Sequence, residues 1–388
     1  MNSCSNRFPA TPLDYRRLAQ SRLPRFIFDY IDGGANDERT LASNVDDFAK
    51  ILIKQRILKN IEHIDTATTL AGAAAAMPVA LAPIGMAGLF HRRGETQGVR
   101  AANAIGVPFT LSTVGICPIE EVKAASGKPF WFQLYMIRDR GAVEDLVKRA
   151  WAEGCTTLIF TIDLPLAGMR HRDLRNGMLS TSLSAKWLKA RQLAARPGWV
   201  WNVGIHGKPH TFGCLADRVE DAADLHKFRA WLDTQFDRSV TWKDIEWLRG
   251  IWPGCLILKG IMEVDDARLA AEVGADGIVV SNHGGRQLDS VASSISKLPP
   301  IVAAVGERLE VLMDGGVRSG LDVFKAVALG AKGVLIGRPW VWALGAAGES
   351  GVRDLLATFK RELEVAMALA GVTTIAAIRC GTLDAVRF

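Results

Sequence analysis

The 388-residue sequence lacks the features of membrane-spanning, secreted and disulfide-rich proteins. No apolar run approaches the roughly 20 residues that a helix needs to cross a bilayer. The N-terminal stretch MNSCSNRFPATPLDYRRL has no apolar signal region, so we expect the chain to stay in the cytoplasm. The six cysteines form no C-x-x-C pair, which argues against a disulfide framework and a zinc site, and we predict no bound metal.

Two nucleotide-binding motifs are also missing. No G-x-G-x-x-G follows an expected strand, and the P-loop pattern G-x-x-x-x-G-K-[ST] occurs nowhere. These absences argue against a Rossmann nicotinamide site and a P-loop, and they leave mononucleotide cofactors and phosphorylated substrates open. With 49% hydrophobic and 23% charged residues, the composition is that of a globular protein.

Short apolar runs, bounded by glycine, proline or polar residues, recur along the chain and predict strands. Their continuous apolar character is typical of parallel strands that are covered on both faces. Alanine-rich helical patterns lie between most of them. Eight such units favour a (β/α)8 barrel, with an open doubly wound sheet as the alternative. The runs are Val79–Pro83, Pro108–Ser112, Phe130–Leu134, Thr157–Asp163, Cys255–Gly260, Gly277–Ser281, Glu310–Asp314 and Gly333–Gly337.

Two segments exceed what a barrel requires. Residues 1–75 precede the first strand and are expected to form a helical extension. Residues 164–254 separate the fourth and fifth strands and are expected to contain a long insertion. We therefore predict one domain over 1–388, with the barrel within 76–380, since the remainder has the usual size of this fold.

The insertion carries the positive charge of the protein. Between Leu164 and Cys214 stand eight Lys or Arg residues and one acid, and the rest of the chain has 39 basic and 40 acidic residues. Trp187, Trp199 and Trp201 lie among these charges. Basic residues interleaved with tryptophan and leucine favour an anionic membrane surface. A solvated surface loop is the alternative, and no nucleic-acid motif accompanies the stretch.

The last two predicted strands end in a candidate phosphate site. Asp314, Gly315, Gly316 and Arg318 follow the seventh strand, and Gly337 and Arg338 follow the eighth. In this barrel the corresponding loops commonly hold a phosphate. Backbone N–H groups at the two glycines and the two guanidinium groups would bind it.

Candidate catalytic residues lie at other strand ends. His283 is the candidate base, since its ordinary pKa suits proton abstraction at neutral pH. Asp163 is expected to orient His283 and to stabilise its protonated form. Arg286 and Arg170 come from different strand ends, and two converging guanidinium groups imply a small carboxylate.

Other polar residues have both a functional and a structural interpretation. Lys259 would neutralise an anion on a cofactor ring, or form a salt bridge inside the barrel. Gln133 and Thr161 would bond a heterocycle, or pack as ordinary polar residues in the barrel interior. Tyr30 and Tyr135 offer hydroxyls to a substrate oxygen, although Tyr30 also suits a helix core.

These residues together resemble a known family. Ser281–Asp289, Ser-Asn-His-Gly-Gly-Arg-Gln-Leu-Asp, is similar to the signature of the FMN-dependent α-hydroxy-acid dehydrogenases and oxidases. Trp131–Tyr135, Thr161–Asp163 with Arg170, and Asp314–Arg318 with Gly337-Arg338 match its other motifs in order. The resemblance extends from about Asp14 to about Ile378.

The resemblance implies a role for each candidate. It implies FMN contacts at Ser112, Gln133, Thr161, Lys259 and residues 314–338. It implies substrate contacts at Tyr30, Tyr135, Arg170 and Arg286, and makes His283 the general base. The proton that His283 removes is that of Cα in a carbanion route, or that of the hydroxyl in a hydride route.

Several segments resemble the quinone-linked L-lactate dehydrogenases of the family. They are Leu111–Val114 with Cys117–Val122, Gln55–Asn60 and Ser239–Asp244. Gly85 stands where oxidases carry alanine, and Val114 where glycolate oxidase has tryptophan. Both positions favour a dehydrogenase, although the similar mandelate dehydrogenases also carry the glycine.

The resemblance thus implies oxidation of a small L-2-hydroxy acid, L-lactate to pyruvate, with electrons passed through FMN to a quinone. Mandelate dehydrogenase and an oxygen-using 2-hydroxy-acid oxidase are the alternatives. It also implies a homo-oligomer, with a tetramer expected. Contact with the cytoplasmic face of the inner (plasma) membrane is expected through residues of about 177–215.

Overall fold

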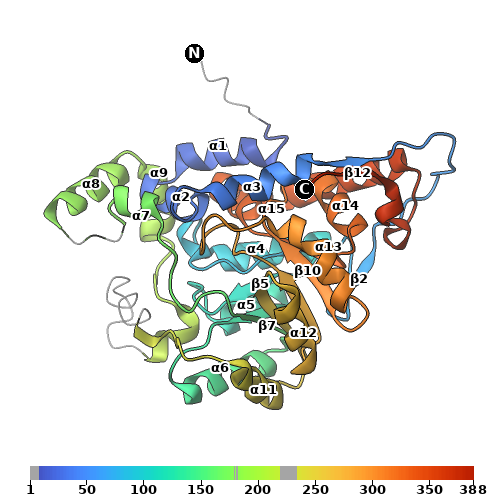
Figure 1. Ribbon diagram of the computed structural model, residues 1–388. Helices are drawn as coiled ribbons and strands as arrows, with labels where there is room; N and C mark the ends of the chain where they lie inside the picture. Colours follow the sequence, from blue (N-terminus) through green and yellow to red (C-terminus); the bar gives the residue numbers. More distant parts are fainter. Residues whose placement is uncertain (1–7, 179, 181, 219–233) are drawn as a thin grey trace.

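A computed structural model describes residues 8–178, 180, 182–218 and 234–388 (Figure 1). Its centre is an eight-stranded parallel sheet in the order β4-β11-β10-β9-β8-β7-β6-β5. A bridge between Leu81 and Phe109 joins the first and last members, so the sheet closes into the predicted (β/α)8 barrel. The strands are β4 (Val79–Leu81), β5 (Thr110–Ser112), β6 (Trp131–Leu134), β7 (Thr157–Thr161), β8 (Cys255–Ile261), β9 (Gly277–Val280), β10 (Glu310–Asp314) and β11 (Gly333–Ile336).

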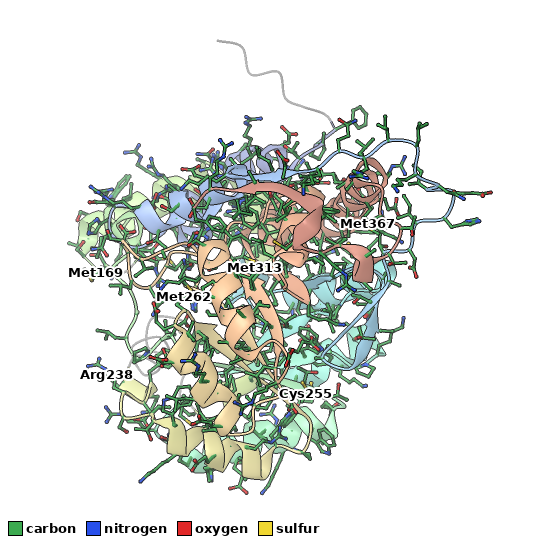
Figure 2. The ribbon with its side chains drawn as sticks, turned by 45° about the vertical axis from the view of Figure 1, so that its right-hand side comes forward. Met169, Arg238, Cys255, Met262, Met313 and Met367 are labelled. Atoms are coloured by element: carbon green, nitrogen blue, oxygen red, sulfur yellow. The ribbon has the colours of Figure 1, made fainter. Side chains whose placement is uncertain are left out.

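The strands are apolar throughout because both of their faces are buried. Side chains of one set, including Trp131, Ile257 and Leu312, form a separate cluster in the barrel interior. Their neighbours in sequence, such as Phe132, Leu258 and Met313, belong to the larger core beneath the helices. Figure 2 shows Met313 within the body of the molecule and Met169 at its margin.

Helices cover the outside of the barrel. Four of them, α4, α6, α12 and α14, follow strands where the alanine-rich patterns predict helices. Capping groups mark several starts, as where Ser319 accepts a hydrogen bond from the backbone N–H of Asp322. The helices are α4 (Gly94–Ile105), α5 (Ile119–Ser126), α6 (Arg140–Ala152), α11 (Trp242–Ile251), α12 (Val264–Glu272), α13 (Ser294–Val305), α14 (Gly320–Ala328) and α15 (Arg338–Ala370).

The N-terminal segment is folded onto the barrel. It comprises α1 (Pro12–Arg22), α2 (Arg25–Asp32), α3 (Arg39–Ala49) and β1 (Ile51–Ile53), which pairs antiparallel with β12 (Leu383–Val386). A hairpin of β2 (Thr68–Leu70) and β3 (Ala73–Ala75) follows. Helix α1 packs on α15, which brings the end of α2 to the carboxyl ends of the barrel strands.

The long connection between β7 and β8 contains short helices. They are α7 (His171–Arg175), α8 (Leu183–Ala194), α9 (Pro197–Trp199), the π-helical turn η2 (Val200–Ile205) and η3 (Gly213–Arg218), before α11 leads into β8. Helix α8 lies at the edge of the molecule, at the left of Figure 1. In the described residues, no helix combines the length and the apolar character needed to cross a bilayer.

Candidate active site

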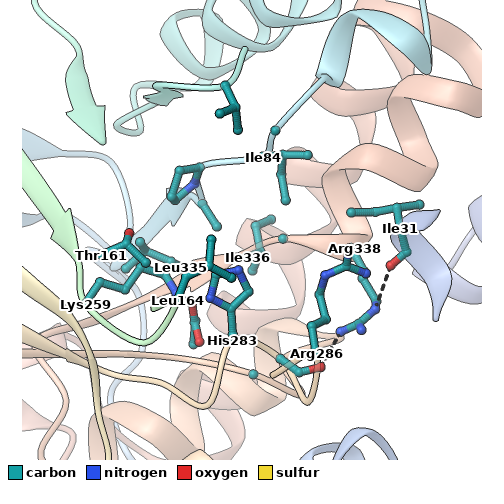
Figure 3. A pocket seen from close by; sticks show the side chains of 18 of the residues that line it. Ile31, Ile84, Thr161, Leu164, Lys259, His283, Arg286, Leu335, Ile336 and Arg338 are labelled. Atoms are coloured by element: carbon teal, nitrogen blue, oxygen red, sulfur yellow. Dashed lines mark hydrogen bonds and ion pairs between the residues drawn. The ribbon is translucent and has the colours of Figure 1, made fainter. Parts of the chain in front are cut away.

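A pocket opens at the carboxyl ends of the barrel strands, where the sequence predicts the functional residues. Figure 3 shows Thr161 and Lys259 on one side, Arg286 and Arg338 on the other, and His283 between them. Of the predicted residues, Ser112, Gln133 and Asp163 do not line the pocket. Those that line it are Tyr30, Tyr135, Thr161, Arg170, Lys259, His283, Arg286, Asp314, Gly315, Gly316, Arg318, Gly337 and Arg338.

His283 and Asp163 form a pair at the pocket wall. The Nδ1 atom of His283 lies 2.8 Å from Oδ1 of Asp163. Because this contact occupies Nδ1, Nε2 is the ring nitrogen left for a substrate. Burial opposes ionisation of Asp163, but His283 and Lys259 outweigh it and keep the pKa of the carboxyl below its ordinary value. Asp163 therefore stays charged and can stabilise a protonated imidazole.

The backbone around this pair is unusual. His283 adopts φ 58°, in the left-handed region that a non-glycine side chain seldom enters. Gly260, at φ 116°, lies so close to Asp163 that a Cβ atom there would be 2.6 Å from the Asp163 Cβ. The sequence points to the two side chains, but not to the requirement for glycine beside them.

Two arginines flank Tyr30. The guanidinium groups of Arg286 and Arg170 lie 5.1 and 5.7 Å from the centre of its ring. Arg170 forms an ion pair with Asp173 at 3.0 Å. In the described residues Arg286 has no carboxylate partner, and it donates only to the carbonyl oxygens of Tyr30 and Gly33. Its burial, together with the charge of Arg170, lowers its pKa to about 10. An anion would relieve this uncompensated charge.

Tyr135 supplies a protonated hydroxyl to the pocket, which it lines together with His283. Burial, followed by the charge of Asp163, raises the pKa of Tyr135 well above its ordinary value. Its ring packs edge-on against Phe236, with the centroids 5.4 Å apart. The hydroxyl is therefore a hydrogen-bond donor at neutral pH, as a substrate oxygen requires.

Lys259 is held by partners on two neighbouring strands. Its Nζ lies 2.9 Å from Oδ2 of Asp314 and 2.9 Å from Oγ of Ser281. Burial favours the neutral amine, but the carboxylates of Asp314 and Asp163 outweigh it and raise the pKa of Lys259. The structure thus shows the salt bridge inside the barrel, and it also places Lys259 on the pocket wall.

Several buried polar atoms fit a heterocycle with a phosphate. Ser112 Oγ donates to Oε1 of Gln133 at 2.8 Å, which leaves the Gln133 Nε2 free to donate elsewhere. Within the described part of the chain, Gln133 Nε2 and Thr161 Oγ1 are buried without a hydrogen-bond partner. Unpartnered buried donors are costly, so a bound group that pairs with them is expected.

The glycines after β10 fit the predicted phosphate loop. Gly315 and Gly316 have φ of 94° and 88°, and a Cβ on Gly316 would lie 1.8 Å from the carbonyl oxygen of Asn44. Only glycine suits that position. The loop is thus held against α3, and both glycines line the pocket.

The two arginines of the predicted phosphate site are partly engaged by the protein itself. Arg338 donates to the carbonyl oxygens of Ile31, Gly33 and Gly284. A guanidinium has five N–H groups, so Arg338 retains two for an anion. Arg318 donates to its neighbour Val317 and stacks 5.1 Å from the Trp342 ring. Burial lowers the pKa of Arg318 to about 10, although Asp322 and Asp32 oppose this shift.

Sequence reasoning missed part of the pocket lining. Phe212 and Phe236 come from the long connection, and Ile84 and Met86 follow β4. No periodic pattern places the two phenylalanines, because they lie in irregular chain. Gly85 is constrained in a way that the sequence does not reveal, since a Cβ there would be 2.8 Å from Cγ2 of Val114.

A charged cluster connects the pocket to the N-terminal segment. Asp32, at the end of α2, binds Arg16 of α1 at 2.6 Å and Arg172 of α7 at 2.8 Å. Arg172 also pairs with Glu38. Because Arg170 and Tyr30 lie two residues from members of this cluster, it fixes the elements that carry the substrate-facing side chains.

A model of one protein family, FMN-dependent dehydrogenase, matches residues 19–385. The chain belongs to the FMN-dependent dehydrogenase family. An L-lactate dehydrogenase of Caulobacter vibrioides is 54% identical over 365 residues, which cover 94% of this chain and 95% of the relative. One from Alcaligenes faecalis is 48% identical, with 94% and 96% covered.

Solved structures show the same fold. The chain is similar to a monotopic membrane protein, (S)-mandelate dehydrogenase, with a TM-score of 0.91 and 34% identity, over 97% of this chain and 99% of the other. It is also similar to a mandelate oxidase, with a TM-score of 0.81 and 39% identity, over 97% and 98%. The protein is therefore an FMN-dependent oxidoreductase. The unpartnered donors of Gln133 and Thr161 and the glycine loop suit that cofactor.

Proposed function

We propose that this FMN-dependent dehydrogenase oxidises a small L-2-hydroxy acid, L-lactate, to the 2-oxo acid, pyruvate. One observation carries the proposal: the imidazole of His283, held by Asp163, shares a pocket with the two arginines that flank Tyr30. A base beside a carboxylate-binding pair is what a hydroxy acid requires. Relatives of about half identity, named L-lactate dehydrogenases, support this substrate.

Arg286 and Arg170 bind the substrate carboxylate. Arg286 lies among carbonyl groups and beside a second guanidinium, so an incoming carboxylate restores charge balance in a buried place. The Tyr30 hydroxyl assists, and the Tyr135 hydroxyl donates to the substrate's 2-hydroxyl oxygen. These contacts orient the substrate toward His283.

His283 removes a proton from the bound hydroxy acid. Its Nε2 accepts the proton, and Asp163, already ionised, stabilises the imidazolium through the 2.8 Å contact at Nδ1. The side chains of His283 and Asp163 are 20% and 12% exposed, and this partial burial strengthens the ion pair. The oxidised product carries a carbonyl in place of the hydroxyl.

The ring of FMN would be held by Ser112, Gln133, Thr161 and Lys259. Its phosphate would be held by residues 314–318 together with Gly337 and Arg338. When bound, FMN supplies the two-electron acceptor. Lys259 keeps a positive charge in the barrel interior through Asp314 and Asp163. That charge would stabilise negative charge on a flavin ring bound in the pocket.

The electrons pass onward to a quinone at the cytoplasmic face of the inner membrane. Helix α8 supports this, because Leu183 and Trp187, one turn apart, are 81% and 72% exposed. Exposed Lys186 and Arg191 accompany them on the same helix. A helix that exposes leucine and tryptophan among basic side chains suits an anionic bilayer surface. Residues 179 and 181 of the predicted contact, about 177–215, lie outside the described residues.

A larger hydroxy acid is the second candidate, and one feature of the pocket favours it. Val114, Phe212 and Phe236 are apolar residues of the pocket lining, and Phe236 packs against Tyr135. Apolar residues of this kind can contact the phenyl ring of a larger substrate, and they can equally contact the methyl group of lactate. (S)-Mandelate is therefore the substrate to compare with L-lactate.

Steady-state kinetics with both acids test the substrate. We expect kcat/KM with a quinone acceptor to be higher for L-lactate than for (S)-mandelate, with little hydrogen peroxide formed in air. A higher value for mandelate would assign the enzyme to the second candidate. Stoichiometric peroxide would identify an oxidase. In either case His283→Gln should retain FMN and lose reduction by the substrate.

Vesicle sedimentation tests the membrane contact. Leu183→Ser should weaken binding to anionic phospholipid vesicles by about tenfold, since burying one leucine contributes roughly 1.5 kcal/mol or more. Leu369→Ser is the matched control, because Leu369 is also exposed but lies on α15. Equal binding of the two variants would count against α8 as the contact.

A further inference from the structure

A second cavity, of about 540 Å³, lies beside the active site. Its walls are the C-terminal end of α1, residues 90–91, residues 195–203 of the long connection, and residues 345–347 of α15. Its volume is within the range of small-molecule sites. None of its lining residues lines the first pocket, so it is a separate site with no role in the chemistry described above.

Two irregular helices shape this cavity. Residues 200–205 form a π-helical turn, and α15 is broken at Ala347 and Gly348, the latter with φ 64°. A Cβ on Gly348 would lie 2.8 Å from Oε1 of Gln97 and 3.2 Å from the His91 ring. Such departures from α-helical geometry cost stability and occur often at functional sites. Here the break at Gly348 makes room for His91.

Most of the wall is apolar and fixed. Leu23, Phe90, Val203 and Ala346 are buried. The Trp199 indole is held in place, since its Nε1 donates to the carbonyl oxygen of Leu89 at 2.8 Å. A flat, apolar ring with a lipophilic tail suits these surfaces better than a charged solute does.

His91 offers one directional donor in this wall. The backbone N–H of Glu349 donates to Gln97 Oε1 at 2.9 Å, which orients the Gln97 amide. Its Nε2 then donates to His91 Nδ1 at 2.6 Å. The acceptor role of Nδ1 places the proton of the neutral ring on Nε2. Burial, with the charge of Arg92, lowers the pKa of His91 and keeps the ring neutral.

One pair of aromatic rings separates the two cavities. Phe90 lines the second cavity and Tyr30 lines the first, and their ring centroids are 6.5 Å apart at an interplanar angle of 26°. A molecule in the second cavity is thus close enough to receive electrons from the active site without entering it. The mouth of the cavity includes exposed Pro197 and Gly198, next to the proposed membrane contact.

We propose that this cavity seats the ring of a quinone, with the Nε2–H of His91 donating to one of its carbonyl oxygens. The inference rests on the acceptor proposed above and adds its location. Each quinone takes up the two electrons that the hydroxy acid gave to the cofactor. It also takes up two protons from solvent at the mouth, while the Nε2–H of His91 holds one carbonyl oxygen by a hydrogen bond. Both carbonyls become hydroxyls, which balances the two hydrogens that the hydroxy acid loses.

Three variants of the holoenzyme test the site. Gly198→Phe fills the mouth, since a Cβ at Gly198 meets nothing within 4 Å. His91→Phe removes the donor, and His91→Gln retains a side-chain N–H. His206→Phe is the matched control, because His206 is exposed on the same connection and does not line the cavity.

The enzyme is reduced anaerobically with dithionite, so that the test does not depend on the identity of the substrate, and is then mixed with a short-chain ubiquinone. Flavin reoxidation should slow about tenfold, equivalent to about 1.4 kcal/mol, in Gly198→Phe and His91→Phe. His91→Gln should recover part of the rate, and His206→Phe should match the wild type. Reoxidation by ferricyanide should be unchanged in all four.

Wild-type rates with the quinone in both Gly198→Phe and His91→Phe would overturn the assignment. So would equal losses with ferricyanide, because they would show a damaged flavin site. Failure of L-lactate to reduce the flavin in a separate mixing experiment would refute the proposed substrate and leave the cavity result standing.

Discussion

Replacing Asp163 with asparagine should slow the chemical step and leave the pocket intact. The side chains are close in size, so the change removes the charge that faces His283 across 2.8 Å. Burial opposes that charge, yet His283 and Lys259 keep the Asp163 pKa lowered. The side chain is therefore a carboxylate at neutral pH.

The expected loss has a lower and an upper bound. Exchanging a charge-assisted hydrogen bond for a neutral one costs roughly 1.4 kcal/mol, or about tenfold in rate. A full ion pair at about 4 Å and an effective dielectric constant of about 20 contributes roughly 4 kcal/mol, or about 10³-fold. We expect the rate of flavin reduction by L-lactate to fall by about 10²-fold, within the usual range for proton transfer to a positioned base.

Anaerobic stopped-flow absorbance measures this step directly. KM should change little, because Asp163 does not line the pocket. Glu310→Gln is the control, since it removes another partly buried carboxylate at the opposite end of a barrel strand. A rate in Asp163→Asn within about twofold of the wild type, with FMN bound, would refute the role of the pair.

Three further changes have defined outcomes. The value of kcat/KM for L-lactate should fall as pH rises through about 10, because burial and the charge of Arg170 lower the pKa of Arg286 to about 10 and the neutral form binds the carboxylate weakly. A pH profile that stays flat to 11 (roughly one pH unit past that pKa) would contradict this. Gly85→Ala should raise KM and lower the melting temperature, since the new Cβ would lie 2.8 Å from Val114 Cγ2. Adding Val114→Ala in a double-mutant cycle should recover most of both effects. If the double mutant shows no recovery, the strain lies elsewhere. Gly260→Ala should reduce the rate of flavin reduction at least as much as Asp163→Asn does, because its Cβ would displace Asp163, and a normal rate would show that the loop adapts.

The strands were the most predictable part of the structure. Seven of the eight apolar runs contain a whole barrel strand, and the run Cys255–Gly260 covers all of β8 except its last residue, Ile261. The runs are recognisable because parallel strands covered on both faces need uninterrupted apolar residues. The polar residues that follow these apolar runs therefore identify the site from the sequence alone. His283, Lys259, Thr161 and Asp314 all reach one pocket for that reason.

Contacts across distant segments could not be predicted. Arg338 was expected to serve a phosphate, and it also binds the carbonyl oxygens of Ile31 and Gly33. That use depends on where α1 and α2 dock, which no local pattern encodes. Phe212 and Phe236 reach the pocket for a similar reason, since irregular chain has no period to reveal which side chains turn inward.

The central claim is that this pocket transfers two electrons from L-lactate to FMN. It is tested most directly by the visible spectrum of the purified protein under anaerobic conditions, before and after L-lactate is added. We predict an oxidised flavin band that bleaches promptly, at a rate that His283→Gln abolishes. A flavin band that L-lactate leaves unchanged while (S)-mandelate bleaches it would contradict the proposed substrate, and bleaching that persists in His283→Gln would contradict the proposed base.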